Sequence, residues 1–173
     1  MNKLRIHHLI QFAVFTALQV LLINKLVLFD TGFCFIYIAF ILFLPIELPT
    51  VLLLLFGFIS GFAVDIFYDT AGIHAAATVL LAYVRPFVLK LLTPRDGYDS
   101  ADSINLHRMG WRWFLVYAFV LIFIHHIALF FLELGSFRSF GFTFLKVLVS
   151  TFFTGIIVLI IQLLFFSAKR VTR

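Results

Sequence analysis

The sequence is short of charged residues and of cysteine. Of its 173 residues, only 12% are Asp, Glu, Lys or Arg, whereas 64% are hydrophobic. Soluble domains carry about 25% charged residues, and a chain this apolar has too little polar surface to cover a soluble core. The single cysteine, Cys34, excludes an internal disulfide and every cysteine metal motif. These shortages predict an all-α integral membrane protein.

Several functional classes are excluded because their patterns are missing. The net charge of +5 comes from basic residues that flank apolar runs, so nucleic-acid binding is not expected. No His-Glu-x-x-His motif of a zinc protease occurs, and Ser60-Gly61 lacks the preceding glycine of a serine intramembrane protease, because Phe58 stands there. We therefore expect no enzyme, no cofactor and no metal site.

Apolar runs divide the chain into six segments. Crossing the hydrocarbon core takes about 20 residues, and the expected spans are 8–28, 32–46, 50–68, 71–92, 111–133 and 142–166. The second is short and ends at Pro45, so we expect it to tilt or to thin the bilayer locally. The whole chain, 1–173, is expected to form a single transmembrane domain. The polar stretch 93–110 is interpreted as a solvated cytoplasmic connector, with a docking site as the alternative.

Basic residues at both ends of the chain predict its orientation. The positive-inside rule places both termini in the cytoplasm, which requires an even number of spans. Six spans leave most Lys and Arg residues inside. The basic residues on the outer side are then Lys25, Arg138 and Lys146.

The stretch 50–94 is the most informative part of the sequence. Gly57, Gly61 and Asp65 recur at four-residue intervals and share one helix face. Glycines let another backbone approach closely in lipid, so this face is predicted to receive a partner helix. Asp65 and His74 are expected to form a buried pair, which either forms the floor of a pocket or a partner-helix contact, or only ties the hairpin together. A hairpin turn with a polar pocket is predicted from Asp65, Asp69, Gly72, His74, Thr78, Arg85 and Pro86.

Other polar residues within the apolar runs have plainer interpretations. Arg85 is interpreted as a lipid anchor that snorkels to headgroups, and Pro86 as a helix kink. Gln19 is expected to hydrogen-bond to a neighbouring helix, and the small residues from Ser150 to Gly155 to pack against one. A secondary polar cluster is predicted from His125, His126, Glu133 and Lys146, with a Glu133–Lys146 pair as the alternative.

The residues of the hairpin resemble the rod shape-determining protein MreD family. That family's pattern is a glycine-spaced helix ending in Asp, a short turn, and Gly-x-His-Ala opening the next helix. The matching positions are Gly57, Gly61, Asp65, Gly72, His74 and Ala75, and Tyr83-Val84-Arg85-Pro86 is also similar. The match covers about a quarter of the chain. The resemblance implies a six-helix bundle similar to the substrate-binding subunits of energy-coupling-factor transporters.

The resemblance also implies a function and partners. It implies a non-catalytic scaffold of the cell-elongation machinery in the bacterial inner membrane, which binds the single-span protein MreC. Through MreC it would link MreB filaments to RodA and its penicillin-binding transpeptidase, and so regulate cell shape and peptidoglycan synthesis. Membrane lipid is a further expected partner, and a homodimer stays open. The alternative is a vitamin-like small-molecule binding subunit of a transporter, with Asp65/His74 and His126/Glu133 lining its site.

Overall fold

A computed structural model describes residues 6–23, 26–98, 104–135 and 139–165. The described chain is mostly helical, and four helices are long and apolar enough to cross a membrane. These are α3 (Thr50–Tyr68), α4 (Ile73–Leu91), α6 (Trp111–Leu134) and α7 (Phe140–Phe165). Their apolar composition and their length of about 28 to 39 Å, at about 1.5 Å per residue, confirm a multi-pass helical membrane protein.

The first two predicted spans differ from long helices. α1 (Ile6–Leu21) has 16 residues, so it is about 24 Å long. The expected helix at 32–46 is wrong, because that stretch contains β2 (Gly32–Phe33), η2 (Ile36–Ile38) and the five-residue helix α2 (Ala39–Phe43). β1 (Val27–Leu28) pairs antiparallel with β2 in a small hairpin. The prediction of six spanning helices therefore fails at its second member.

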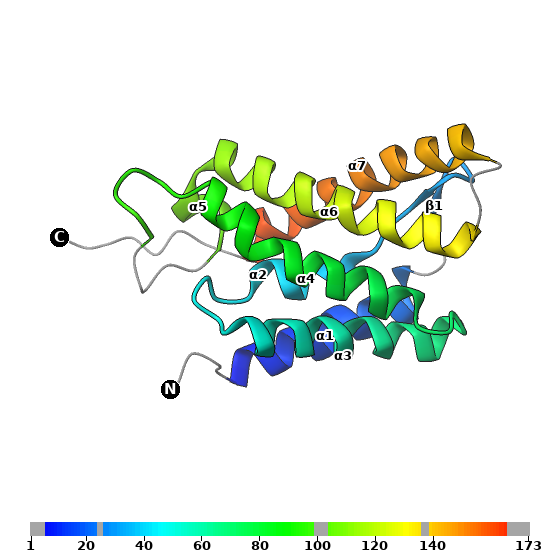
Figure 1. Cartoon of the computed structure of the whole chain (residues 1–173), viewed down its shortest axis with the longest axis horizontal. Helices are drawn as coiled ribbons and strands as arrows, with labels where there is room; N and C mark the ends of the chain where they lie inside the picture. The colour runs from blue at the N-terminus through cyan, green and yellow to red at the C-terminus, as the bar shows by residue number, and fades with distance from the viewer. Residues whose placement is uncertain (1–5, 24–25, 99–103, 136–138, 166–173) are drawn as a thin grey trace.

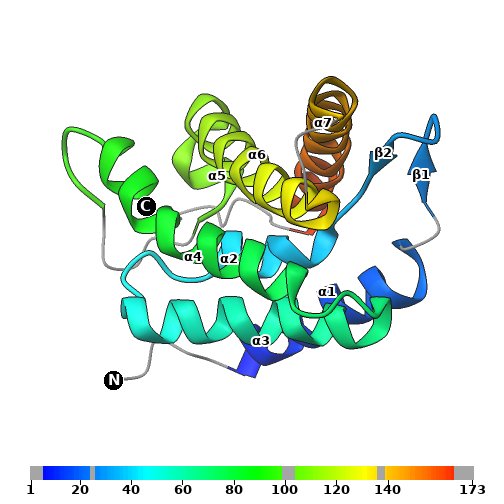
Figure 2. The ribbon, with the colours of Figure 1, turned by 45° about the vertical axis from the view of Figure 1, so that its right-hand side comes forward.

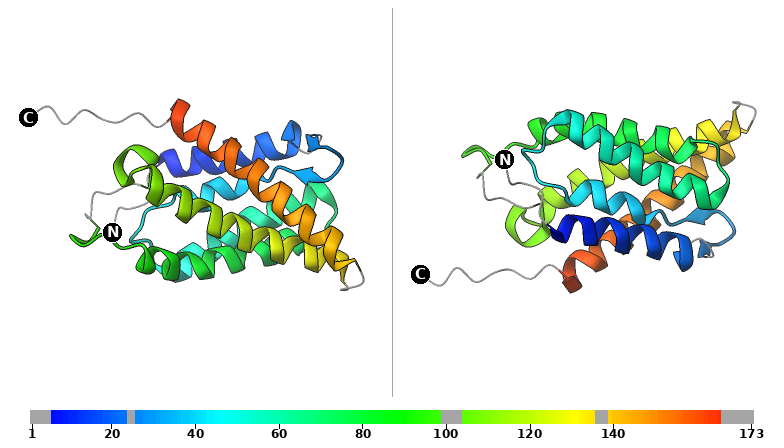
Figure 3. Two further views of the ribbon diagram at one scale, coloured as in Figure 1. Left: turned by 90° about the horizontal axis from the view of Figure 1, so that it is seen from above. Right: turned by 90° about the horizontal axis from the view of Figure 1, so that it is seen from below.

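The broken stretch that replaces the second expected helix lies inside the bundle. We call residues 34–44 the central segment, and each of them is at most 6% exposed. Figure 2 shows α2 between the layer of α3 and α4 and the pair formed by α6 and α7, while α1 lies beside η2 and α3. Figure 3 shows the same arrangement from above and below. The part of the chain in which the expected spanning helix is broken is thus deeply buried.

The elements run in alternate directions along the long axis of the bundle. α1 begins and α7 ends at the same end, which also holds the connection between α4 and α6 (Figure 1). We call this the loop end. The opposite end, which we call the turn end, holds the tight turn between α3 and α4 and the connection between α6 and α7. The basic residues at both termini, together with Lys25 and Arg138, lie outside the described residues.

The connector 93–110 is described on both sides of residues 99–103. A short helix, α5 (Leu106–Met109), begins at Asn105, whose side chain accepts a hydrogen bond from the Arg108 backbone N–H at 2.8 Å. Tyr98 donates to the carbonyl of Leu89 at 2.7 Å, and Trp113 donates to the carbonyl of Leu92 at 2.8 Å. The Tyr98 bond thus ties the connector to the end of α4, and the Trp113 bond ties the start of α6 to it.

Candidate functional site

The glycine face of α3 packs against α4 of the same chain. A Cβ on Gly61 would lie 2.5 Å from the Ala75 Cα and 2.5 Å from the His74 carbonyl oxygen, and one on Gly57 would lie 2.9 Å from the Ala82 Cβ. The close backbone approach is therefore confirmed. Its assignment to a partner helix is wrong, because α4 already occupies this face.

Asp65 caps the N-terminus of α4. One carboxylate oxygen, Oδ1, accepts from the Thr70 hydroxyl at 2.5 Å and from the His74 backbone N–H at 3.0 Å, while Oδ2 accepts from the Ala75 N–H at 2.8 Å. A carboxylate satisfies free N–H groups and the positive end of the dipole at a helix N-terminus. Asp65 and His74 are both buried and adjacent, but the carboxylate binds the backbone of His74 and not its imidazole.

The turn between α3 and α4 needs unusual backbone angles. Asp69 ends α3 with φ +56°, and Gly72 precedes α4 with φ +92°. Glycine adopts this left-handed region readily and Asp does so more often than most residues. The Asp69 side chain is exposed, and at this turn it is Thr70 that contributes a side chain, by donating its hydroxyl to the capping Asp65.

The central segment takes hydrogen bonds from side chains of the surrounding helices. Gln19 of α1 donates to the Cys34 carbonyl at 3.1 Å and accepts from the Tyr37 N–H at 3.4 Å. On the other side, Thr154 of α7 accepts from the Phe35 N–H at 3.1 Å. Backbone that is not helical must be satisfied in this way at membrane depth, since lipid offers no hydrogen bonds. The expected bond from Gln19 to a neighbouring helix is confirmed, because Gln19 Nε2 also donates to the Tyr68 hydroxyl of α3 at 2.7 Å.

Arg85 holds the loop end of the central segment. Its side chain is fully buried and donates to the carbonyls of Leu44 and Pro45. Its Nε donates to the Tyr117 hydroxyl at 2.8 Å, and that hydroxyl donates to the Leu42 carbonyl at 2.8 Å. The interpretation of Arg85 as a lipid anchor is wrong, because the guanidinium points into the bundle. α4 continues as a helix through Pro86.

The Tyr37 hydroxyl is the centre of a buried cluster. It lies 3.1 Å from His74 Nδ1, 3.1 Å from Thr78 Oγ1 and 2.8 Å from His125 Nε2. Thr78 donates its own proton to the His74 carbonyl at 2.7 Å. One assignment uses every group: Tyr37 donates to Thr78, and both histidines donate to the Tyr37 oxygen. Nδ1 of His125, which has no partner among the described residues, is then a lone pair and not an orphaned N–H.

The predicted secondary polar cluster divides into two parts. His126 is fully buried, with Nδ1 2.6 Å from the Ile122 carbonyl oxygen and Nε2 3.3 Å from Thr154 Oγ1. Glu133 lies at the turn end and pairs with Lys146 at 3.2 Å, as the alternative predicted. The Lys146 ammonium also lies 4.5 Å from the centre of the Phe130 ring. No group of three His, Cys, Asp or Glu side chains within the described ranges could hold a metal ion.

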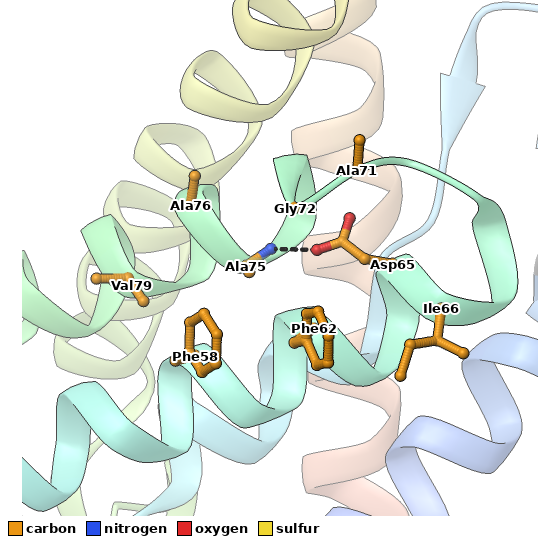
Figure 4. Close-up of a pocket in the computed structure, with 9 residues that line it drawn as sticks. All are labelled: Phe58, Phe62, Asp65, Ile66, Ala71, Gly72, Ala75, Ala76 and Val79. Carbon is orange, nitrogen blue, oxygen red and sulfur yellow. Dashed lines mark hydrogen bonds between the residues drawn. The ribbon is translucent and has the colours of Figure 1, made fainter.

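The predicted polar pocket also divides. His74, Thr78 and Arg85 share the inward face of α4, as their spacing predicted, and all three are buried by the central segment and α6. Asp65 and Gly72 instead line a groove on the outer surface of the hairpin (Figure 4), with a cavity volume of about 460 Å³. The residues predicted to line one pocket therefore belong to a buried cluster and to a separate apolar groove.

Two tyrosines of the buried clusters were missed from the sequence. Tyr37 and Tyr117 are both fully buried, and each links the central segment to side chains of other helices. A buried tyrosine hydroxyl usually has a hydrogen-bond partner, so a tyrosine inside an apolar run is itself a signal. For Tyr37 this signal is stronger, because the apolar run around it is short and ends at Pro45.

Comparison of this chain with protein-family models, with curated proteins and with solved structures finds no match. The chemistry of the site therefore has to be argued from its own geometry. The polar groups around Tyr37 and Arg85 bind one another and the backbone of the central segment, whereas Thr151 Oγ1 and Gln162 Nε2 have no partner among the described residues. Such an arrangement fixes the path of that segment and determines the shape that the bundle presents to lipid or to other proteins.

Proposed function

We propose that this protein is a non-catalytic scaffold of the bacterial cell-elongation complex, similar to MreD, in the inner membrane. It has six passes, of which the broken central segment is one, and both termini face the cytoplasm. The loop end is then cytoplasmic and the turn end faces outward. Its partners are an MreC-like single-span protein and, directly or through it, RodA, the penicillin-binding transpeptidase and MreB filaments.

The observation that carries this proposal is what the hairpin residues do. Gly57 and Gly61 admit the α4 backbone, Asp65 caps α4, and Gly72 supplies the left-handed turn before it. These are the positions that resemble the MreD pattern, and each has a structural task in one rigid unit. These residues pack, cap and turn the two helices and so shape a surface for another protein, which supports a scaffold.

The transporter alternative is less well supported by the contacts. It requires His74, His126 and Glu133 to line a binding site, but the two histidines are buried against the Phe35 ring and Glu133 is paired at the turn end. Gentle extraction followed by mass spectrometry separates the two proposals. A stoichiometric small molecule, or a co-purified ATPase, would favour transport.

The test of the scaffold proposal is purification of the tagged protein in mild detergent from its own bacterium, with identification of the retained proteins. We expect the MreC-like single-span protein of the same genome, and we expect depletion of the scaffold to turn rods into spheres. Recovery without that partner, together with unchanged cell shape after depletion, would refute the proposal.

A further inference from the structure

An apolar groove follows the outer surface of the hairpin between α3 and α4. Its floor consists of small residues from the start of α4 (Ala71, Gly72, Ala75, Ala76), with Val79 beyond them, and its wall includes Phe58 and Phe62 of α3. The two phenyl rings are stacked, with centroids 5.5 Å apart, and remain about half exposed at 49% and 47%. Small residues beside an aromatic ridge form a surface that another helix backbone can approach closely.

The turn end of the groove is acidic. Asp65 lines it, as Figure 4 shows, and the exposed Asp69 follows in the same turn. Asp65 accepts only neutral N–H and O–H groups, and within the described residues no basic side chain lies within ion-pair distance of it. The α4 dipole offsets only about half a charge. The stretch 50–84, from which both sides of the groove are built, contains no Lys or Arg, so neither side of the groove itself supplies a cation to this end.

The charge excludes two occupants. An anionic phospholipid would bring its negative headgroup close to Asp65 and Asp69, and like charges near a low-dielectric surface repel, while a zwitterionic phospholipid has no net positive charge to match them. A second copy related by a two-fold axis would place the same carboxylates opposite each other, because a two-fold interface is self-complementary. The remaining occupant is a peptide helix whose cation lies at the turn end.

We propose that the groove binds one membrane-spanning helix of a separate chain, which carries a Lys or Arg near its outer end beside Asp65 and Asp69. This inference rests on the proposed function and identifies the surface by which the single-span partner is held. The partner helix lies against Ala76 and the Phe58–Phe62 ridge, on the opposite side of α4 from the buried Tyr37 cluster. It therefore binds without rearranging the hydrogen bonds of the central segment.

The test uses Ala76→Leu with Ala13→Leu as its matched control. Both alanines are exposed on helices, but Ala76 lines the groove and Ala13 lies on α1. The full chain is co-expressed with the tagged full-length MreC-like protein of the same genome. We expect Ala76→Leu to lower the recovered complex by about tenfold, which corresponds to about 1.4 kcal/mol. Ala13→Leu and wild type should be recovered equally, and both variants should keep the wild-type melting temperature.

The acidic end is tested separately by Asp69→Asn, with Asp96→Asn at the loop end as control. Asn tolerates the left-handed backbone of residue 69, so only the charge changes. We expect a loss of a few-fold in recovered complex for Asp69→Asn alone. Cysteine cross-linking locates the partner helix on the groove. Ala76→Cys should form disulfides with cysteines introduced at every third or fourth residue of the partner helix, whereas Ala13→Cys should form none.

The outcomes separate this inference from the function on which it rests. Equal recovery of wild type, Ala76→Leu and Ala13→Leu would overturn the groove and leave the scaffold function standing. Loss with Ala13→Leu alone would place the partner on α1 and overturn the groove as well. Failure of the wild-type chain to retain the MreC-like protein would refute the proposed function and the occupant together.

Discussion

The hairpin of α3 and α4 and the central segment bury backbone in opposite ways. In the hairpin, two glycines without side chains let one helix touch the backbone of the next. In the central segment, polar side chains of three surrounding helices, Gln19, Thr154 and Arg85, form hydrogen bonds with backbone groups that have no partner within a helix. The hairpin is therefore sensitive to added volume, and the central segment to lost polar atoms.

This difference teaches where the bundle can tolerate change. A helix keeps its own backbone hydrogen bonds in lipid, so the hairpin needs only shape complementarity. The ends of the central segment depend on side chains for their backbone hydrogen bonds, so deleting one of those donors or acceptors leaves a buried backbone group unpaired. Substitutions that conserve polarity but add volume should damage the first region, while isosteric deletions should damage the second.

The largest effect is expected for Gly61→Leu. Its Cβ would meet the Ala75 Cα and the His74 carbonyl, which are backbone atoms that cannot rotate away. Forced separation of α3 from α4 should cost at least about 3 kcal/mol. We expect little folded protein in mild detergent, measured by thermal unfolding monitored with size-exclusion chromatography.

Gly141→Leu is the matched control for this variant. A Cβ at Gly141 of α7 meets nothing within 4 Å. Its melting temperature should stay close to wild type, since surface changes are usually within about 0.5 kcal/mol. Equal melting temperatures for the two variants would show that α3 and α4 are not packed backbone to backbone.

The hairpin was largely predictable from the sequence, and the central segment was not. The spacing of Gly57, Gly61 and Asp65 and the short turn to His74 are local, so their proximity followed from helix geometry. The stretch 32–46 is as apolar as a buried helix. Hydrophobic periodicity alone does not distinguish a buried helix from a buried irregular segment of this length. Its path depends on Arg85 and Thr154, which are distant in sequence, so it could not be read locally.

The same reasoning explains why the buried cluster and the groove were predicted as one pocket. His74, Thr78 and Arg85 were placed correctly on one face of α4, since that follows from helix periodicity. What faces them could not be known, because the central segment was expected to be a helix with satisfied backbone. Because that segment is broken into η2 and the short helix α2, the same polar residues become hydrogen-bond partners of its backbone and of Tyr37 instead of a pocket lining.

The second largest effect is expected for Arg85→Met, which conserves most of the apolar stem but removes all donors. The carbonyls of Leu44 and Pro45 lose charge-assisted hydrogen bonds, which are roughly twice as strong as neutral ones. Each buried acceptor left unpaired costs about 1–3 kcal/mol. We expect a lower melting temperature and protease cleavage near residue 45.

Arg112→Met tests whether this loss is specific to the buried position. Arg112 is exposed and its guanidinium lies 5.2 Å from the centre of the Trp111 ring. Removing this exposed charge should change stability by less than about 1 kcal/mol. If Arg112→Met were as destabilising as Arg85→Met, the buried hydrogen bonds of Arg85 would not be what holds the central segment.

The smallest effect is expected for Tyr37→Phe, which removes one oxygen from the middle of the central segment. His74, Thr78 and His125 all lose a partner, but Thr78 keeps its bond to the His74 carbonyl. Each imidazole can also turn a lone pair instead of an N–H toward the gap by changing tautomer. We therefore expect a loss of about 1–2 kcal/mol, with the exposed Tyr83→Phe unchanged. A melting temperature for Tyr37→Phe equal to that of Tyr83→Phe would mean that the cluster fills space only, and that side-chain hydrogen bonds hold the central segment at its two ends alone.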